Sequence, residues 1–262
     1  MNYSEGGGAP DSKYFKLLNV GFTLAEVLIT IGILGVVIAM TLPAIIGSYK
    51  EKAATTQLKK TYSILSQAFN QIVSETGADP RGWGMGDMSD KNTHIIMANQ
   101  FVPYLNIMYN CVGKDREYTK KHCIDNPDYS DPTYRASVRL IDGTTLSFRN
   151  WFADCKGRYG NNKYLQNVCG TITVDINGQK NPNLLGNDMF IFYMTTYGIY
   201  PTGTEYETRS TFSDYCDKTK GWGTMYNGYN NGTGCTAWVI YNENQEYLKC
   251  TGLNWGGKKK CR

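Results

Sequence analysis

An apolar run opens with Gly21-Phe22-Thr23-Leu24-Ala25-Glu26 and continues to Ile46. It holds 25 residues from Phe22 onward, and Glu26 carries the only charge among them. About 20 apolar residues suffice to cross the hydrocarbon core of a bilayer as a helix. Because a carboxylate inside a membrane is costly unless it is paired, such a residue indicates a functional site. The plainer alternative is a signal anchor that carries a glutamate near the membrane interface.

The residues around Glu26 follow a specific pattern. A short polar leader ends at Gly21, the next residue is Phe22, and Glu26 is the fifth residue counted from Phe22. This string resembles the class III signal of type IV prepilins and type II secretion pseudopilins, and the resemblance covers about 17–73. Pro43 also lies where many pilins carry a proline in the first helix. The leader of the family usually carries a net positive charge, whereas the side-chain charges of residues 1–21 here sum to zero.

The resemblance implies a processing step and a fold. A prepilin peptidase would cleave between Gly21 and Phe22 and N-methylate the new terminus at Phe22. Glu26 would act in subunit assembly, since Thr23 and Thr30 can donate hydrogen bonds to it but cannot neutralise its charge. The expected fold is α+β and pilin-like, with a long N-terminal hydrophobic helix packed on an antiparallel β-sheet that carries disulfide-tied loops.

The resemblance also implies partners and a location. The expected partners are other pilin or pseudopilin subunits, the prepilin peptidase, an inner-membrane assembly platform and, before assembly, membrane lipid. The chain would be a single-pass protein of the bacterial inner membrane, with its globular domain outside the cytoplasm. It would then pass into a periplasmic or cell-surface filament. We therefore expect a structural subunit of a type IV pilus-like or type II secretion pseudopilus filament.

Other export signals fit the chain less well. An ordinary secretory signal has an apolar stretch of about 7–15 residues followed by an A-x-A-like cleavage site. The run here is longer, and residues 45–50 form a poor cleavage site. A lipoprotein signal is excluded because the first cysteine is Cys111. We expect a leader at 1–21, an N-terminal helix at 22–76 and a globular extracytoplasmic domain at 77–262. Within the helix, about 22–46 would be transmembrane and about 47–76 amphipathic.

The second half of the predicted helix carries an apolar stripe. Its members recur at spacings of 4, 3, 4 and 3, as expected for one helix face, and are Leu58, Tyr62, Leu65, Phe69 and Ile72. Gly77 and Pro80 supply a stop signal. We expect the stripe to pack on the protein's own sheet. The mean hydropathy of −0.41 indicates that most of the chain faces water, and the net charge of +4 identifies no partner.

All eight cysteines follow the apolar run, at positions 111, 123, 155, 169, 216, 235, 250 and 261. An even number confined to the exported part predicts disulfides. Cys111 with Cys123, Cys155 with Cys169 and Cys216 with Cys235 would close short loops, although sequence alone leaves 105 pairings open. No C-x-x-C motif occurs and only His94 and His122 offer imidazole ligands, so we expect no metal site.

The periodicity changes after Gly77. The segment 81–90 reads as a loop and 94–104 as a short helix. A hairpin is predicted over 138–148 around Asp142-Gly143, a pair that favours a type I′ turn. Further strands are predicted at 171–176, turned by Asn177-Gly178, and at 189–195. The apolar segment 237–241 is too short to assign.

The loop 175–183, followed by Asp188, raises the question of calcium, because Asp and Asn oxygens near a glycine turn can coordinate Ca²⁺. Some pseudopilins hold calcium in their globular domain. The EF-hand spacing is absent, however, so the simpler interpretation is a turn whose Asp and Asn side chains bond local backbone. We expect no cofactor.

Enzymatic and nucleic-acid functions find less support. The chain lacks G-x-S-x-G, H-E-x-x-H and P-loop motifs and has two histidines, so we expect no enzyme. The tail Lys258-Lys259-Lys260-Cys261-Arg262 and the 20 tyrosines could contact phosphates and bases. The alternative function is therefore a minor pilin of a DNA-uptake filament. A solvated basic tail held by Cys261 is the simpler account, and we expect no DNA partner.

Overall fold

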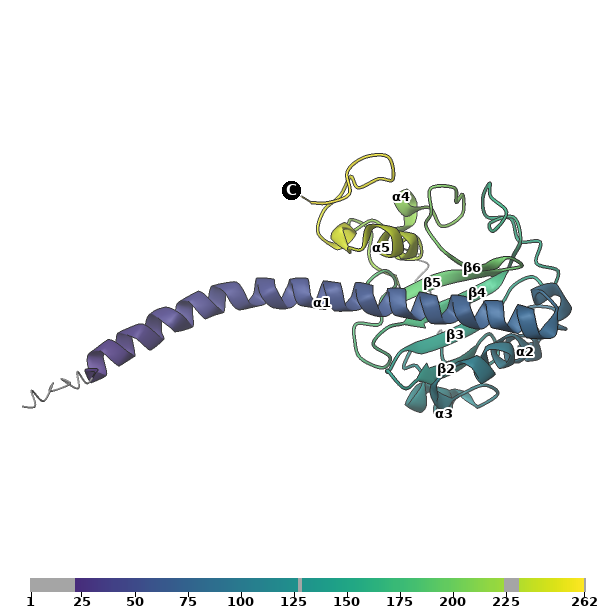
Figure 1. Cartoon of the computed structure of the whole chain (residues 1–262), viewed down its shortest axis with the longest axis horizontal. Coiled ribbons are helices and arrows are strands. Elements are labelled where there is room, and N and C mark those ends of the chain that lie inside the picture. Colours follow the sequence, from purple (N-terminus) through teal and green to yellow (C-terminus); the bar gives the residue numbers. More distant parts are fainter. Residues whose placement is uncertain (1–21, 127–128, 224–230, 262) are drawn as a thin grey trace, which may run out of the picture. The chain divides into compact units, whose positions relative to one another are not determined.

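The computed structural model describes residues 22–126, 129–223 and 231–261, and its architecture is α+β (Figure 1). The chain divides into two compact units, Met1–Gly47 and Ser48–Arg262. The α-helices are α1 (Leu24–Thr76), α2 (Lys91–Phe101), α3 (Arg116–His122), α4 (Phe212–Tyr215) and α5 (Thr236–Asn242). The strands are β1 (Ile107–Asn110), β2 (Ala136–Leu140), β3 (Thr145–Asn150), β4 (Val168–Asp175), β5 (Met189–Thr195) and β6 (Gly198–Pro201). Short 3₁₀ turns occur at Pro80–Gly82, Val102–Tyr104 and Glu246–Leu248.

Helix α1 is a single helix of 53 residues, which confirms the expected long N-terminal helix. It continues through Pro43. It ends at Thr76, because Gly77 adopts a left-handed conformation with φ +66° and donates its N–H to the Val73 carbonyl at 3.0 Å. Glycine is favoured at this position because other residues pay a steric penalty there.

Within the second unit, α1 packs on the sheet through the predicted stripe. Leu58, Leu65 and Ile72 are fully buried. The Tyr62 ring stacks on Phe192 of β5, with ring centroids 5.2 Å apart and planes 9° from parallel. The expectation that the stripe contacts the protein's own core is confirmed.

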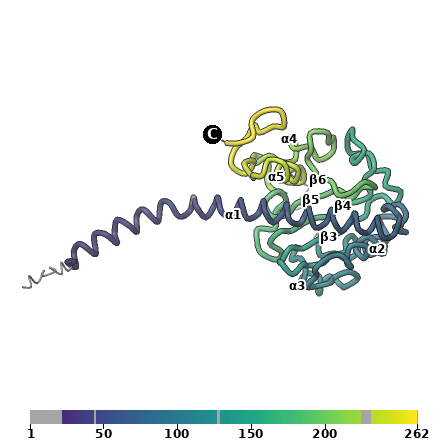
Figure 2. Tube along the Cα trace, viewed as in Figure 1, coloured from purple at the N-terminus to yellow at the C-terminus, as the bar shows by residue number. Residues whose placement is uncertain are grey.

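The six strands form one antiparallel sheet whose spatial order equals their order in the sequence. Figure 2 labels β3 to β6 of this sheet along the Cα trace. Side chains alternate between its faces: Phe190 and Phe192 belong to the core that contains Leu58 of α1, whereas Ile191 and Tyr193 point to the other face. Every residue of β4 and β5 is buried. The sheet is thus covered on both faces, by α1 together with α2 and α5 on one and by loops on the other.

The turn between β2 and β3 is the predicted Asp142-Gly143 site, but its type differs from the expectation. Leu140 N–H donates to the Thr144 carbonyl at 2.8 Å, which leaves three residues in the loop. Only Gly143 has a positive φ, +91°, whereas a type I′ turn needs two such residues. The type I′ prediction is therefore wrong.

The two strands that flank the Asn177-Gly178 turn are close to the prediction, except that β4 begins three residues earlier, at Val168. The strands pair antiparallel, with Asp175 opposite Met189, so residues 176–188 form the link. Asn177-Gly178 lies at the start of this loop, as expected. The expected helix at 94–104 begins earlier, at Lys91, because Asp90 caps it by accepting from Asn92 N–H at 2.9 Å.

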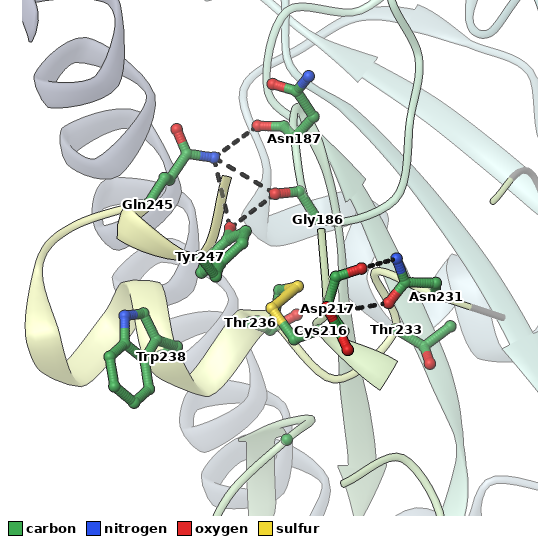
Figure 3. The surroundings of a disulfide bond; sticks show 12 residues. Gly186, Asn187, Cys216, Asp217, Asn231, Thr233, Thr236, Trp238, Gln245 and Tyr247 are labelled. Atoms are coloured by element: carbon green, nitrogen blue, oxygen red, sulfur yellow. Dashed lines mark hydrogen bonds between the residues drawn. A yellow bond between two sulfur atoms is a disulfide. The ribbon is translucent and has the colours of Figure 1, made fainter. Parts of the chain in front are cut away.

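The structure contains four disulfides: Cys111–Cys123, Cys155–Cys169, Cys216–Cys235 and Cys250–Cys261. The predicted oxidised state is confirmed, and the three suggested local pairs are among the four. Figure 3 shows the third of them beside a pair of hydrogen bonds that join Asp217 to Asn231, at 3.0 and 2.8 Å. Each of the four disulfides joins cysteines that are 11 to 19 positions apart in the sequence.

Candidate functional site at the start of the N-terminal helix

The residue predicted to act in subunit assembly, Glu26, lies in the first turn of α1. Gly21, the expected residue before the cleaved bond, lies outside the described residues. Phe22 precedes the helix and is exposed. Thr23 occupies the position before the first helical residue, and Glu26 is the third residue of the helix.

Thr23 and Glu26 bind each other reciprocally. The Glu26 carboxylate accepts hydrogen bonds from the Thr23 backbone N–H and hydroxyl, both at 2.8 Å. The Thr23 hydroxyl oxygen in turn accepts from the Glu26 backbone N–H at 3.2 Å. This arrangement is a capping box, which satisfies N–H groups that have no partner inside the helix. Glu26 therefore caps its own helix and also carries a negative charge.

The sequence carried the signal for this contact. Thr23 and Glu26 stand at the S/T-x-x-E spacing of a capping box. We expected Thr23 and Thr30 to donate to Glu26, and only Thr23 is shown doing so. The Thr30 hydroxyl donates to the Val27 carbonyl at 2.9 Å, one turn back along the helix. The reciprocal half of the contact was missed.

Beyond Glu26, the described part of the first unit carries no further charge and is mostly apolar. Its large apolar side chains from Leu24 to Ile46 are exposed to the surroundings, and Lys50 is the first basic residue after Phe22. Among the described residues, α1 is the one helix whose length and hydropathy would let it cross a membrane. The Glu26 charge thus has hydrogen-bond donors in its own segment but no cation there.

The loop considered for calcium holds two buried acidic residues. Asp188 accepts from the backbone N–H groups of Asn183 at 2.9 Å and Leu184 at 2.7 Å, and from the Asn177 amide at 3.1 Å. Asp175 accepts from Asn177 N–H at 3.2 Å. Burial, together with the charge of Asp188, raises the pKa of Asp175 well above its usual range. These bonds match the simpler interpretation of a loop held by Asp and Asn side chains.

Metal ligation finds no further support in the described part of the chain. No three His, Cys, Asp or Glu side chains there are grouped so as to hold a metal ion. His94 is fully buried and accepts from Asn150 N–H at 3.1 Å. Burial and the positive charges of Arg149 and Arg135 lower its pKa to about 4. His94 is thus a neutral core residue at physiological pH.

The basic C-terminal segment is partly engaged with its own loop. The Lys259 ammonium lies 5.2 Å from the Trp238 ring centroid and 5.0 Å from that of Trp255, and it donates to the Trp255 carbonyl. Lys258 donates to the Thr251 carbonyl at 3.4 Å. Arg262 lies outside the described residues. Two of the lysines considered for DNA therefore have contacts within the chain, which weakens that alternative.

Two buried groups outside these segments gave no sequence signal. Glu207 and Tyr193 are 4% and 3% exposed, and the Tyr193 hydroxyl donates to the Glu207 carboxylate. Glu207 also accepts from Gly203 N–H at 2.6 Å and Ser210 N–H at 2.8 Å. The contact between Tyr193 and Glu207 joins β5 to a loop that follows β6, so only the tertiary structure reveals it.

Comparison with known proteins identifies a family. A family model described as a family of unknown function (DUF6613) matches residues 44–253, and the chain belongs to this family. No curated protein and no solved structure matches the chain. The matched region begins at residue 44, near the end of the apolar segment 22–46. It therefore covers the second half of α1 and the whole sheet.

Proposed function

We propose that this chain, a member of the family DUF6613, is a structural subunit of a filament of the type IV pilus or type II secretion pseudopilus kind. The observation that carries the proposal is the start of α1. This helix begins two residues after Phe22, and Glu26, in its first turn, carries the only charge in the apolar segment that runs to Ile46. The α+β architecture, with that helix packed on an antiparallel sheet, is compatible with a pilin-like fold.

The proposed assembly contact is electrostatic. In a membrane the Glu26 carboxylate keeps its Thr23 hydrogen bonds, but these donors are neutral and leave the negative charge uncompensated. Cleavage before Phe22 would create an α-ammonium group on each subunit. Pairing that group with Glu26 of a neighbouring subunit would offset much of the desolvation cost and fix the axial position of one helix on the next.

The proposal includes processing and location. A prepilin peptidase would remove residues 1–21 and methylate Phe22. Residues 22–46 would hold the subunit in the inner membrane until an assembly platform extracts it. Intact-mass and N-terminal peptide analysis of the membrane-extracted protein should then give N-methyl-Phe22 as the first residue. A terminus after Gly47, or an uncut chain, would contradict the proposal.

Three variants separate the two roles of Glu26. Glu26→Ala removes both the charge and the cap, Glu26→Gln keeps an acceptor for Thr23 but removes the charge, and Thr23→Val keeps the charge but removes the hydroxyl contact. We expect both Glu26 variants to be inserted and cleaved but to enter filaments poorly, while Thr23→Val assembles well. Sheared-filament yield relative to membrane-bound subunit measures this. Normal assembly of Glu26→Gln would exclude the charge pairing.

A further inference from the structure

A cavity of about 250 Å³ lies on the sheet face opposite α1. Ile191 and Tyr193 of β5 reach it, and these residues alternate with the phenylalanines that face α1. Three further aromatic side chains, Trp151, Tyr159 and Tyr215, line the same cavity. Trp151 and Tyr159 come from the segment between β3 and β4 and Tyr215 from α4, so separate parts of the chain build one aromatic-walled pocket.

The aromatic walls are held in place. The Tyr159 and Tyr193 rings lie 5.1 Å apart at 55°, and both residues are more than nine-tenths buried. The Trp151 indole N–H donates to the Thr171 hydroxyl at 3.1 Å, and the Arg149 guanidinium lies 3.9 Å from its ring centroid. Walls fixed in this way lose little conformational freedom when a ligand enters.

The lining of the pocket carries positive charge, and the buried Glu207 carboxyl lies behind it, bonded to Tyr193 and Ser210. Arg135 and Arg209 both line it, and no aspartate or glutamate is among the described residues that do. Arg209 is exposed, with its guanidinium 4.8 Å from the Tyr159 ring centroid, so it stands at the rim above an aromatic wall. Arg135 is 4% exposed and donates to the Thr173 hydroxyl at 3.3 Å. The planar guanidinium group suits carboxylate ligands.

Hydroxyl groups complete the lining. Thr171, Thr202, Ser210 and Thr233 all border the cavity. The Thr202 hydroxyl already donates to the Ile191 carbonyl at 2.9 Å and can serve a ligand as an acceptor, whereas the Thr171 hydroxyl accepts from Trp151 and can still donate. Hydroxyls both donate and accept hydrogen bonds, so they suit a ligand that itself carries hydroxyl groups. Ligand pockets commonly combine apolar or aromatic walls with a small number of placed polar groups, and this cavity has room for about one ring-sized ligand.

We propose that this pocket binds one acidic sugar unit, a hexuronic acid. The aromatic walls would pack against the apolar face of the sugar ring, the hydroxyl groups would bond its hydroxyls, and Arg209 would pair with its carboxylate. The site is independent of the filament proposal, because it uses neither Phe22 nor Glu26.

Isothermal titration of the full-length chain in a mild detergent tests the site with four probes. Sodium glucuronate should bind. Glucose has the same ring without the carboxylate, and sulfate is an anion without a ring, so both should bind about tenfold or more weakly. Benzoate has a carboxylate and a ring but no hydroxyls, and it should also bind more weakly.

Two variants complete the test. Arg209→Gln should weaken glucuronate binding about tenfold, the effect of losing one charge-assisted hydrogen bond, while leaving glucose binding unchanged. Arg158→Gln is the matched control, since Arg158 is also exposed but does not line the cavity. No heat of binding for glucuronate up to about 50 mM would overturn the proposal. Equal affinity for benzoate or sulfate, or an unchanged affinity in Arg209→Gln, would overturn it as well.

Discussion

Glu207 makes the stability of the globular unit depend on pH. Burial raises the pKa of this carboxyl to about 7, against the opposing effect of hydrogen bonds from Tyr193, Gly203 and Ser210. Its usual value is 4.5. One pKa unit corresponds to about 1.4 kcal/mol, so ionising Glu207 costs about 3 kcal/mol more in the folded chain than in the unfolded chain.

The sign of the effect follows from the raised pKa. The stabilisation from protonated Glu207 is fully present below about pH 4.5 and is lost as the pH rises through about 7. The variant Glu207→Gln stays neutral throughout. It loses the acceptor for Gly203 N–H, which gives a penalty that does not vary with pH. Relative to the parent, Glu207→Gln should therefore gain stability between pH 5 and pH 8.

Thermal unfolding of the full-length chain in detergent, followed by circular dichroism at pH 5 and pH 8, measures this difference. About 2.5 kcal/mol of the effect falls between pH 5 and pH 8, so the Tm of Glu207→Gln minus that of the parent should rise by about 5–10 °C over this range for a unit of this size. Other buried acids, such as Asp175, titrate in both chains and cancel. Glu205→Gln is the control, because Glu205 is exposed on the same loop. A difference that is equal at both pH values, or that falls, would refute the reasoning.

Three further changes test the packing of the unit. Leu65→Ala removes a fully buried side chain of α1 and should lower the free energy of unfolding by about 2–5 kcal/mol, measured by urea denaturation. Asp142→Asn should remove the part of the acid-induced loss of folding stability that comes from protonation of Asp142. Although burial acts to raise the pKa of Asp142, hydrogen bonds from residues that include Lys60 hold it at about 2, so the parent loses this stabilisation as pH falls from about 4 to 2. Gly203→Ala should prevent folding, seen as loss of the monomeric peak in gel filtration, because a Cβ there would lie 1.8 Å from the Gly234 carbonyl oxygen.

Local signals in the sequence predict much of the fold. The stripe through Leu58 and Ile72 places α1 on the sheet, and the Asp142-Gly143 pair places the β2–β3 turn, because each depends on neighbouring residues. The edge strands β1 and β6 have four residues each and were not predicted. Strands this short are defined by their pairing partners rather than by their own periodicity. The helix α5 has seven residues, and its apolar segment was left unassigned because it is too short to distinguish a strand from a helix.

The two candidate sites, Glu26 and the pocket, also differ in how well local sequence signals predict them. Glu26 stands out because a single charge interrupts an apolar run, and its Thr23 cap follows from a three-residue spacing. The pocket on the opposite sheet face gave no such signal. Trp151 and Tyr159 lie in the segment between β3 and β4, whereas Arg209 lies in the loop after β6, and nothing in the order of residues indicates that they meet. Tertiary structure alone creates that juxtaposition.

The order of the contacts along the chain has a consequence for biogenesis. Every strand pairs with the strand before it in the sequence, and every disulfide closes a short local loop. A chain that emerges N-terminus first can therefore complete each hairpin and oxidise each cysteine pair before the next segment arrives. The far-reaching contacts to Glu51 from Gln245 N–H, at 2.8 Å, and from the Lys249 ammonium, at 2.5 Å, must wait for the C-terminal segment. Such a chain needs an oxidant more than a disulfide isomerase.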